Sequence, residues 1–165
     1  MAFCTTGWQF AAGWYGGGNR RRFESMTASG PAPMGVLASV HGEPVGWCAC
    51  GPRARYTAAI AGRSSLLTDR PRNEDDTVWL VACLFIAASH RSAGVAVPML
   101  RAAVVLARNE GATAIEAWPL AAGARRRGDE YLGREGVFAR LGFRCVQRPS
   151  ADRAIMRLEL AEGTS

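Results

Sequence analysis

The sequence contains no lysine, because all 20 of its basic residues are arginine, and with 14 acidic residues its formal net charge is +6. It also lacks an apolar run of roughly 18 residues, the minimum for a membrane-spanning helix. The longest apolar stretch, near residues 78–88, has the length of a buried strand. Residues 1–14 lack the basic region that opens a secretory signal. We therefore expect no membrane span and a cytoplasmic location.

The absence of lysine coincides with 29 alanines, a combination typical of coding bias in a GC-rich genome. Most of the arginine content therefore says little about function. The remaining positive balance suits a polyanion, either a nucleotide cofactor or a nucleic acid. No predicted helix has a continuous arginine face, and no nucleic-acid reader motif occurs. We therefore do not expect a nucleic-acid partner.

Motifs for metal binding are also missing. The five cysteines form no C-x-x-C pair, and neither histidine stands at a zinc-ligand spacing from another candidate ligand. We expect no metal site and predict that all five are buried, reduced thiols: Cys4, Cys48, Cys50, Cys83 and Cys145.

The length of 165 residues, 48% of them hydrophobic, fits one domain with its own core, and we predict a single domain over residues 1–165. Alternating and apolar patterns predict six strands, at 35–40, 45–51, 77–87, 113–118, 144–148 and 154–160. Helical periodicity predicts a long helix at 94–109 and shorter helices at 19–26, capped by Asn19, and at 134–141. This order indicates an α/β fold with a mixed sheet.

The most informative stretch joins the predicted buried strand at 77–87 to the long helix. A short loop containing Arg91 and Gly94 precedes the helix start, where unpaired N–H groups and the helix dipole favour a phosphate. Gly94 permits close approach of a ligand to the backbone. Ala96 keeps the first helical turn free of bulk. The stretch therefore predicts a phosphate-binding loop.

The string Arg91-Ser92-Ala93-Gly94-Val95-Ala96 resembles the signature Arg/Gln-x-x-Gly-x-Gly/Ala of the GNAT superfamily of acyl-CoA-dependent N-acetyltransferases. The resemblance covers about residues 35–160 and continues through 107–112, 115–119 and 138–143, with Gly46-Trp47 upstream. It implies an α/β (α+β) fold with a mixed, mostly antiparallel sheet flanked by helices and strands that splay at the cofactor cleft. The segment 1–34 would be a shortened, atypical N-terminus.

The resemblance also implies acetyl-CoA as cofactor and an amine of a small molecule or protein as acceptor, with a homodimer as a further expectation. The CoA pyrophosphate would be bound by the backbone amides of Arg91, Ser92, Ala93, Gly94, Val95 and Ala96. Main-chain groups of Leu84, Phe85 and Ile86 would hold the pantetheine arm and polarise the thioester carbonyl. The amine would attack the thioester directly.

Three side chains are candidates near the reacting groups. Glu116 lies in a predicted buried strand and acts either as base or amine binder, or as the salt-bridge partner of an arginine. Phe138 occupies the place of a tyrosine that protonates the departing thiolate in many relatives, and we expect it beside the cofactor. Tyr131 takes over that acid role or packs in the core. The acid is dispensable if a thiol of pKa about 8.5 leaves as thiolate.

The absent tyrosine and the short N-terminus leave a second interpretation open, a non-catalytic acyl-CoA-binding or regulatory module. The first strand of the family is either lost or supplied in a short form by residues 3–10. The aromatic and glycine-rich N-terminal segment either lines the acceptor pocket or packs against the sheet or a second subunit. The run 125–127 of three arginines either reaches the 3′-phosphate of CoA or an acidic acceptor, or is solvated. The acceptor itself depends on 1–29, 56–77 and 121–129, where the resemblance gives no guidance.

Overall fold

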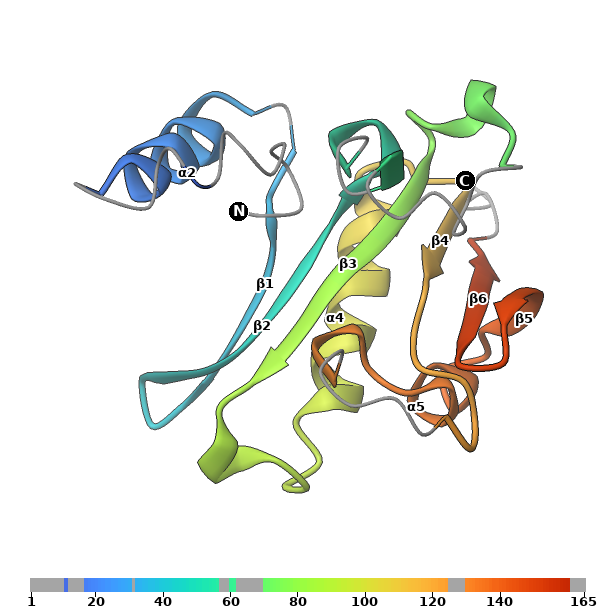
Figure 1. Cartoon of the computed structure of the whole chain (residues 1–165). Coiled ribbons are helices and arrows are strands. Elements are labelled where there is room, and N and C mark those ends of the chain that lie inside the picture. Colours follow the sequence, from blue (N-terminus) through green and yellow to red (C-terminus); the bar gives the residue numbers. More distant parts are fainter. Residues whose placement is uncertain are drawn as a thin grey trace.

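The computed structural model describes residues 11, 17–30, 32–56, 60–61, 70–124 and 130–160. In this part of the chain six strands form one sheet in the order β1-β2-β3-β4-β6-β5 (Figure 1). The β3–β4 pair is parallel and the other neighbouring pairs are antiparallel, which confirms the predicted mixed, mostly antiparallel sheet. The strands are β1 (Gly35–Val40), β2 (Glu43–Pro52), β3 (Val78–Ile86), β4 (Ala114–Ala117), β5 (Arg144–Ser150) and β6 (Arg153–Glu159).

The described helices are α2 (Gly18–Ser29), α4 (Ala96–Asn109) and α5 (Glu135–Ala139). Four short 3-10 turns accompany them: η1 (Arg53–Tyr56), η2 (Arg72–Glu74), η3 (Ala88–His90) and η4 (Glu130–Leu132). No helix in this part of the chain is long and apolar enough to cross a membrane.

The helix boundary at Asn19 was predicted wrongly. Gly17 is the N-cap of α2, with a φ of 72°, and Asn19 lies in the first turn. Glycine reaches this left-handed conformation without strain, so the helix begins earlier than the capping residue suggested. It also ends at Ser29 and not at Met26. The predictions for residues 3–10 and 125–127 lie outside the described residues.

One face of the sheet is covered by α4, which lies behind the strands in Figure 1. Of the apolar repeat predicted for this helix, Leu100, Val104 and Ala107 are buried against the sheet, whereas Val97 is only half-buried. The three buried residues meet Val81 and Ile115 in one core cluster. Each fully buried leucine, isoleucine or valine side chain of this cluster stabilises the fold by about 1.5–3 kcal/mol, which fixes α4 against the sheet.

The opposite face carries a second core cluster, covered by η1 and η4. Tyr56 of η1 and Leu132 of η4 are buried there with Leu80 of β3 and Trp118, which follows β4. Because successive strand residues point to opposite faces, β3 contributes to both clusters, with Val81 on the α4 side and Leu80 on the other. This is the two-sided burial that the apolar run near 78–88 predicted.

A β-bulge interrupts β3. Ala49 pairs with Cys83 but the next residue of β2, Cys50, pairs with Val81, so Ala82 is the extra residue. The bulge reverses the alternation along the rest of β3. Leu84 therefore packs on the α4 side, whereas Phe85 projects from the other face and is half exposed.

Beyond the bulge β3 continues without β4. The parallel pairing runs only from Val78↔Ala114 to Val81↔Ala117, while β3 itself extends to Ile86. The two central strands therefore diverge toward the end of β3, as Figure 1 shows. This confirms the splayed strands that the sequence led us to expect.

The cysteines follow the prediction in part. Cys48 and Cys50 are buried on the α4 side of β2, and the pKa of Cys48 is raised by its hydrogen bond with Cys50 and by burial. Cys83 is only half buried and Cys145 is exposed, so the expectation of complete burial was wrong for both. Cys145 lies on β5, an edge strand whose side chains mostly face solvent.

The link between η4 and α5 gives a stability prediction. A Cβ on Gly133, whose φ is +74°, would lie 2.9 Å from Phe138 Cε2 and 3.2 Å from Leu84 Cδ2. We expect Gly133→Ala to lower the free energy of unfolding by about 2–4 kcal/mol, from strain and overlap together, in urea denaturation. Gly136→Ala is the control, because a Cβ there meets nothing within 4 Å. Equal stability of the two variants would contradict the packing.

Candidate functional site

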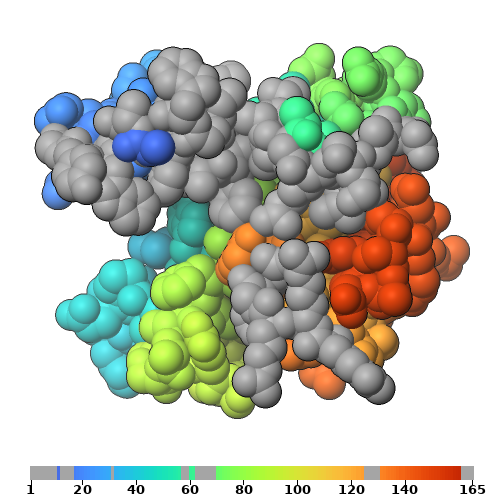
Figure 2. All heavy atoms as spheres, in the orientation of Figure 1, coloured from blue at the N-terminus to red at the C-terminus, as the bar shows by residue number. Residues whose placement is uncertain are grey.

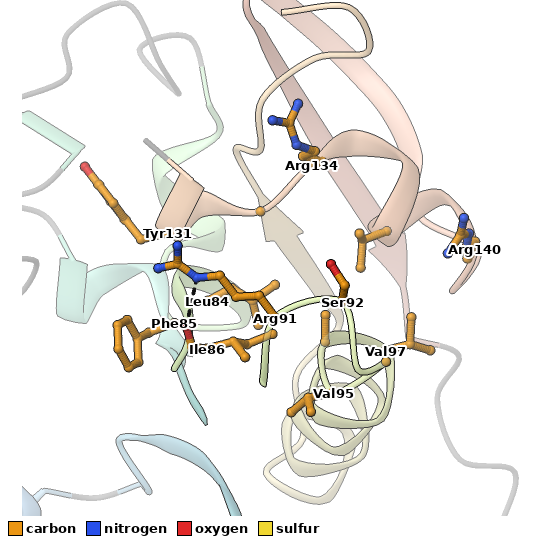
Figure 3. A pocket seen from close by; sticks show the side chains of 14 residues that line it. Leu84, Phe85, Ile86, Arg91, Ser92, Val95, Val97, Tyr131, Arg134 and Arg140 are labelled. Atoms are coloured by element: carbon orange, nitrogen blue, oxygen red, sulfur yellow. Dashed lines mark hydrogen bonds between the residues drawn. The ribbon is translucent and has the colours of Figure 1, made fainter. Parts of the chain in front are cut away.

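A cavity of about 470 Å³ lies where β3 ends and α4 begins (Figure 3). Its walls come from the end of β3, the loop after it, the first turn of α4, and the η4–α5 segment. Nine predicted site residues line it: Leu84, Phe85, Ile86, Arg91, Ser92, Gly94, Val95, Ala96 and Tyr131. Val97, Gly133, Arg134, Val137 and Arg140 complete the lining, whereas Ala93, Glu116 and Phe138 are not part of it.

The loop between β3 and α4 has an unusual backbone. Ser92 and Gly94 both have left-handed conformations, with φ of 64° and 79°. Val95 caps α4 without a side-chain hydrogen bond, so the capping residue leaves the N–H groups of the first turn available. A Cβ on Gly94 would meet no atom within 4 Å, which leaves room beside the loop. The loop therefore has the shape and the polarity of an anion site.

Main-chain groups at the end of β3 also face the cavity. Ala87 N donates to Val45 O of β2 at 2.9 Å. Phe85 lies two residues earlier on the same strand, opposite Trp47, so its main-chain N–H and C=O groups also point toward β2. Because hydrogen bonding alternates along an antiparallel pair, the N–H and C=O groups of Leu84 and Ile86 point away from β2. Arg91 Nε donates to Ile86 O at 3.3 Å, on that side (Figure 3). These groups lie beyond the end of the β4 pairing.

The charged residues on the described walls of the cavity are all cationic. Arg91 extends on the same side as Tyr131, whereas Arg134 and Arg140 lie toward α5 (Figure 3). Three guanidinium groups around a cavity with a helix start at its base favour a ligand with several phosphate charges. The sequence analysis missed Arg134 and Arg140. Arg134 and Arg140 each lie three residues from Val137, and residues with this spacing lie on the same side of a helix. This spacing could have predicted that the two arginines face the same site.

The start of α5 is held by an ion pair. The Glu135 carboxylate accepts hydrogen bonds from both terminal nitrogens of Arg148 and from Ala122 N at 2.8 Å. Hydrogen bonding to Arg148 and then to Ala122 N lowers the pKa of Glu135. Glu135 N donates in turn to Leu120 O at 2.8 Å. These contacts fix the position of α5, and the cavity arginine Arg140 is the C-cap residue of this helix.

Glu116 lies elsewhere, in a buried ion cluster on the sheet. Its Oε2 accepts from Arg53 Nη1 at 3.1 Å, and its Oε1 accepts from Arg157 Nη1 at 3.0 Å. Arg53 is fully buried and also contacts Glu74 and Asp75, at 3.5 and 3.1 Å. Both oxygens of Glu116 are therefore committed to guanidinium groups. These contacts favour the salt-bridge alternative for Glu116 over the base.

The two aromatic candidates, Tyr131 and Phe138, differ in whether they line the cavity. Tyr131 is half-buried and lines the cavity, beside the second core cluster. Phe138 is fully buried and packs edge-to-face against Phe143, with ring centroids 5.4 Å apart. Contact of Phe138 with a cofactor therefore stays a prediction, and of these two residues only Tyr131 lines the cavity.

The geometry agrees with comparisons to known proteins. The sequence matches the family model described as acetyltransferase (GNAT) family over residues 4–128. No curated protein matches it. The fold is similar to that of ribosomal-protein-alanine N-acetyltransferase from Brucella melitensis, at 17% identity and a TM-score of 0.57, covering 86% of this chain and 77% of that one.

Two further solved structures share the fold. The structure of yncA from Salmonella typhimurium with its cofactor acetyl-CoA has 15% identity and a TM-score of 0.60, covering 89% of this chain and 75% of that one. An N-acetyltransferase from Staphylococcus aureus Mu50 has 15% identity and a TM-score of 0.57, covering 86% and 75%. With its family match over most of the sequence, the chain belongs to the GNAT acetyltransferase family and is an enzyme whose cofactor is acetyl-CoA.

Proposed function

We propose that the enzyme transfers an acetyl group from acetyl-CoA to a primary amine of a small molecule or protein by direct attack on the thioester. The cavity at the divergence of β3 and β4 carries this proposal. It joins a helix start suited to phosphate with strand main-chain groups that lack a neighbouring strand in the described structure.

The chain's own residues divide the binding task. The backbone amides of residues 91–96 hold the pyrophosphate, with open space beside Gly94 for its approach. Arg134 and Arg140 supply positive charge on the opposite wall. The N–H and C=O groups of Leu84 and Ile86 bind the pantetheine amides as a neighbouring strand would.

Acetyl-CoA supplies an activated acyl group when it is bound. Nucleophilic attack forms the new C–N bond, breaks the C–S bond and releases one amine proton, and CoA leaves as thiolate. The N–H groups at the end of β3 stabilise the charge that develops on the carbonyl oxygen, a contribution worth several kcal/mol in comparable sites. Tyr131, which lines the same cavity, is the candidate for protonating the thiolate.

A thermal-shift titration tests donor binding first. At about a hundred times the Kd, a ligand adds roughly 2.7 kcal/mol of stability, so we expect acetyl-CoA and CoA to raise the Tm and ATP to leave it unchanged. Release of free thiol from acetyl-CoA, measured with a panel of primary amines, then tests transfer. A thermal shift without thiol release for any amine would favour the non-catalytic acyl-CoA-binding module.

Gly94 provides a direct test of the anion site. We expect Gly94→Glu to weaken acetyl-CoA binding at least about 100-fold, because it places a carboxylate beside the pyrophosphate. Isothermal titration calorimetry measures the loss. Gly111→Glu is the matched control, since Gly111 also has a positive φ, +76° against +79°, and open space for a Cβ. Wild-type affinity in Gly94→Glu would refute the assignment.

Glu116→Gln separates the two interpretations of that residue. Loss of a charged hydrogen-bond partner in the buried cluster should lower the free energy of unfolding by about 1.5–3 kcal/mol. If Glu116 serves as an ion-pair partner, kcat falls by the same factor at pH 7 and pH 9. A base predicts a larger loss at pH 7, where the amine is protonated. Glu159→Gln is the control, because it removes an exposed carboxylate from the same Arg157.

A further inference from the structure

An apolar row crosses three strands on the sheet face opposite α4. Leu37 of β1 pairs with Trp47 of β2, and Trp47 pairs with Phe85 of β3. Directly paired residues of antiparallel strands point to the same face. Their strand neighbours, such as Val36 and Ile86, pack toward α4, so the three row residues project from the other face.

The row is open to solvent at both ends. Leu37 is 60% exposed and Phe85 is 50% exposed, with the half-buried Trp47 between them. Single exposed apolar residues are common, and Val105 and Val146 are examples in this chain. Leu37, Trp47 and Phe85, in contrast, are contiguous on neighbouring strands, spaced about 4.8 Å apart, and make a surface about 10 Å wide. That width accommodates an aromatic ring.

The row is continuous with the acetyl-CoA cavity. Phe85 belongs to both, because it lines the cavity and closes one end of the row. Figure 3 shows Phe85 and Tyr131 extending toward the same side of the cavity. Near the middle of the row, Phe23 of α2 meets Trp47 edge-on, with ring centroids 6.2 Å apart. In Figure 2 the β1–β2 hairpin and the end of β3 lie side by side on the visible face.

The row and the cavity differ in charge. The row residues are uncharged, and so are Ala49 and Cys83, a pair that lies two residues further along β2 and β3. The cavity, in contrast, carries three arginines on its described walls. A polycationic acceptor needs carboxylates for recognition and is repelled by the arginines. An apolar acceptor removes the row from water and leaves its amine beside Phe85, at the cavity.

We infer that the acceptor is a small primary amine with an aromatic or bulky aliphatic group, and that this group docks on Leu37, Trp47 and Phe85. The inference rests on the proposed acetyl transfer and specifies its acceptor. The apolar group contributes binding affinity and the strand end at Phe85 directs the amine toward the thioester. Leu37 touches the acceptor's apolar group only, so it determines specificity without taking part in acetyl-CoA binding.

The test compares 2-phenylethylamine with spermidine by release of free thiol from acetyl-CoA, with the full chain. We expect kcat/KM to be at least about tenfold higher for 2-phenylethylamine. Leu37→Ser should raise the KM for that amine about tenfold and leave the Kd for acetyl-CoA unchanged. Val146→Ser is the matched control, because Val146 is a similarly exposed residue (56%) on the other edge strand. It should change neither value.

Each contrary outcome is distinct. A higher kcat/KM for spermidine, or an unchanged KM in Leu37→Ser, would overturn the acceptor assignment and leave acetyl transfer intact. A wild-type dimer that Leu37→Ser converts to a monomer in analytical ultracentrifugation would assign the row to a second copy of the chain and overturn the inference. No thiol release with any amine, despite acetyl-CoA binding, would overturn the proposed transfer itself.

Discussion

The divergence of β4 from β3 after Val81 is the constraint on which the rest of the site depends. Because the parallel pairing stops there, the main-chain groups of Leu84 and Ile86 on that side have no neighbouring strand in the described part of the chain, and Arg91 Nε donates to Ile86 O. A sheet edge of this kind is ordinarily a liability, since it invites pairing with another chain. Here the η4–α5 segment lies across the opening, and the space between becomes the cavity.

The bulge at Ala82 decides what each wall of that cavity presents. Without the extra residue, Leu84 and Phe85 would exchange faces, since a shift of one residue inverts the pattern of a strand. With it, Leu84 joins the core under α4 and Phe85 projects on the opposite face. One local irregularity thus sets which side chains at the end of β3 face α4 and which project from the opposite face of the sheet.

Charge burial stabilises the other end of β3. Arg53 has no exposed surface, and removing its charge from water costs several kcal/mol unless carboxylates compensate. Glu116, Glu74 and Asp75 do so, and they join η1, η2 and β4. Burial lowers the pKa of Arg157, but hydrogen bonds to Glu159, Glu74 and Glu116 raise it by more, so the pKa lies above its ordinary value. The strands are therefore clamped together at this end and separate at the other.

What the sequence predicted, and what it did not, follows from the range of each interaction. The buried strand, the amphipathic helix and the loop at Arg91–Ala96 depend on neighbours in sequence, so their patterns were readable. The partners of Glu116 were not, because Arg53 and Arg157 are 63 and 41 residues away and meet it only through strand register. Cys145 was misjudged since its burial depends on which strand forms the sheet edge.

For the same reason, the proposed acceptor site is the part of the function that is hardest to predict from the sequence. Leu37, Trp47 and Phe85 lie on three separate strands, and none of them belongs to a local motif for apolar binding. They form a surface only because the register of the β1–β2 hairpin and the bulge in β3 place them side by side on the same face of the sheet. The proposed donor site, in contrast, is a continuous loop, residues 91–96, whose own backbone has a geometry that suits a phosphate. The proposed donor site is therefore predictable from local sequence, whereas the proposed acceptor site depends on the pairing of the strands.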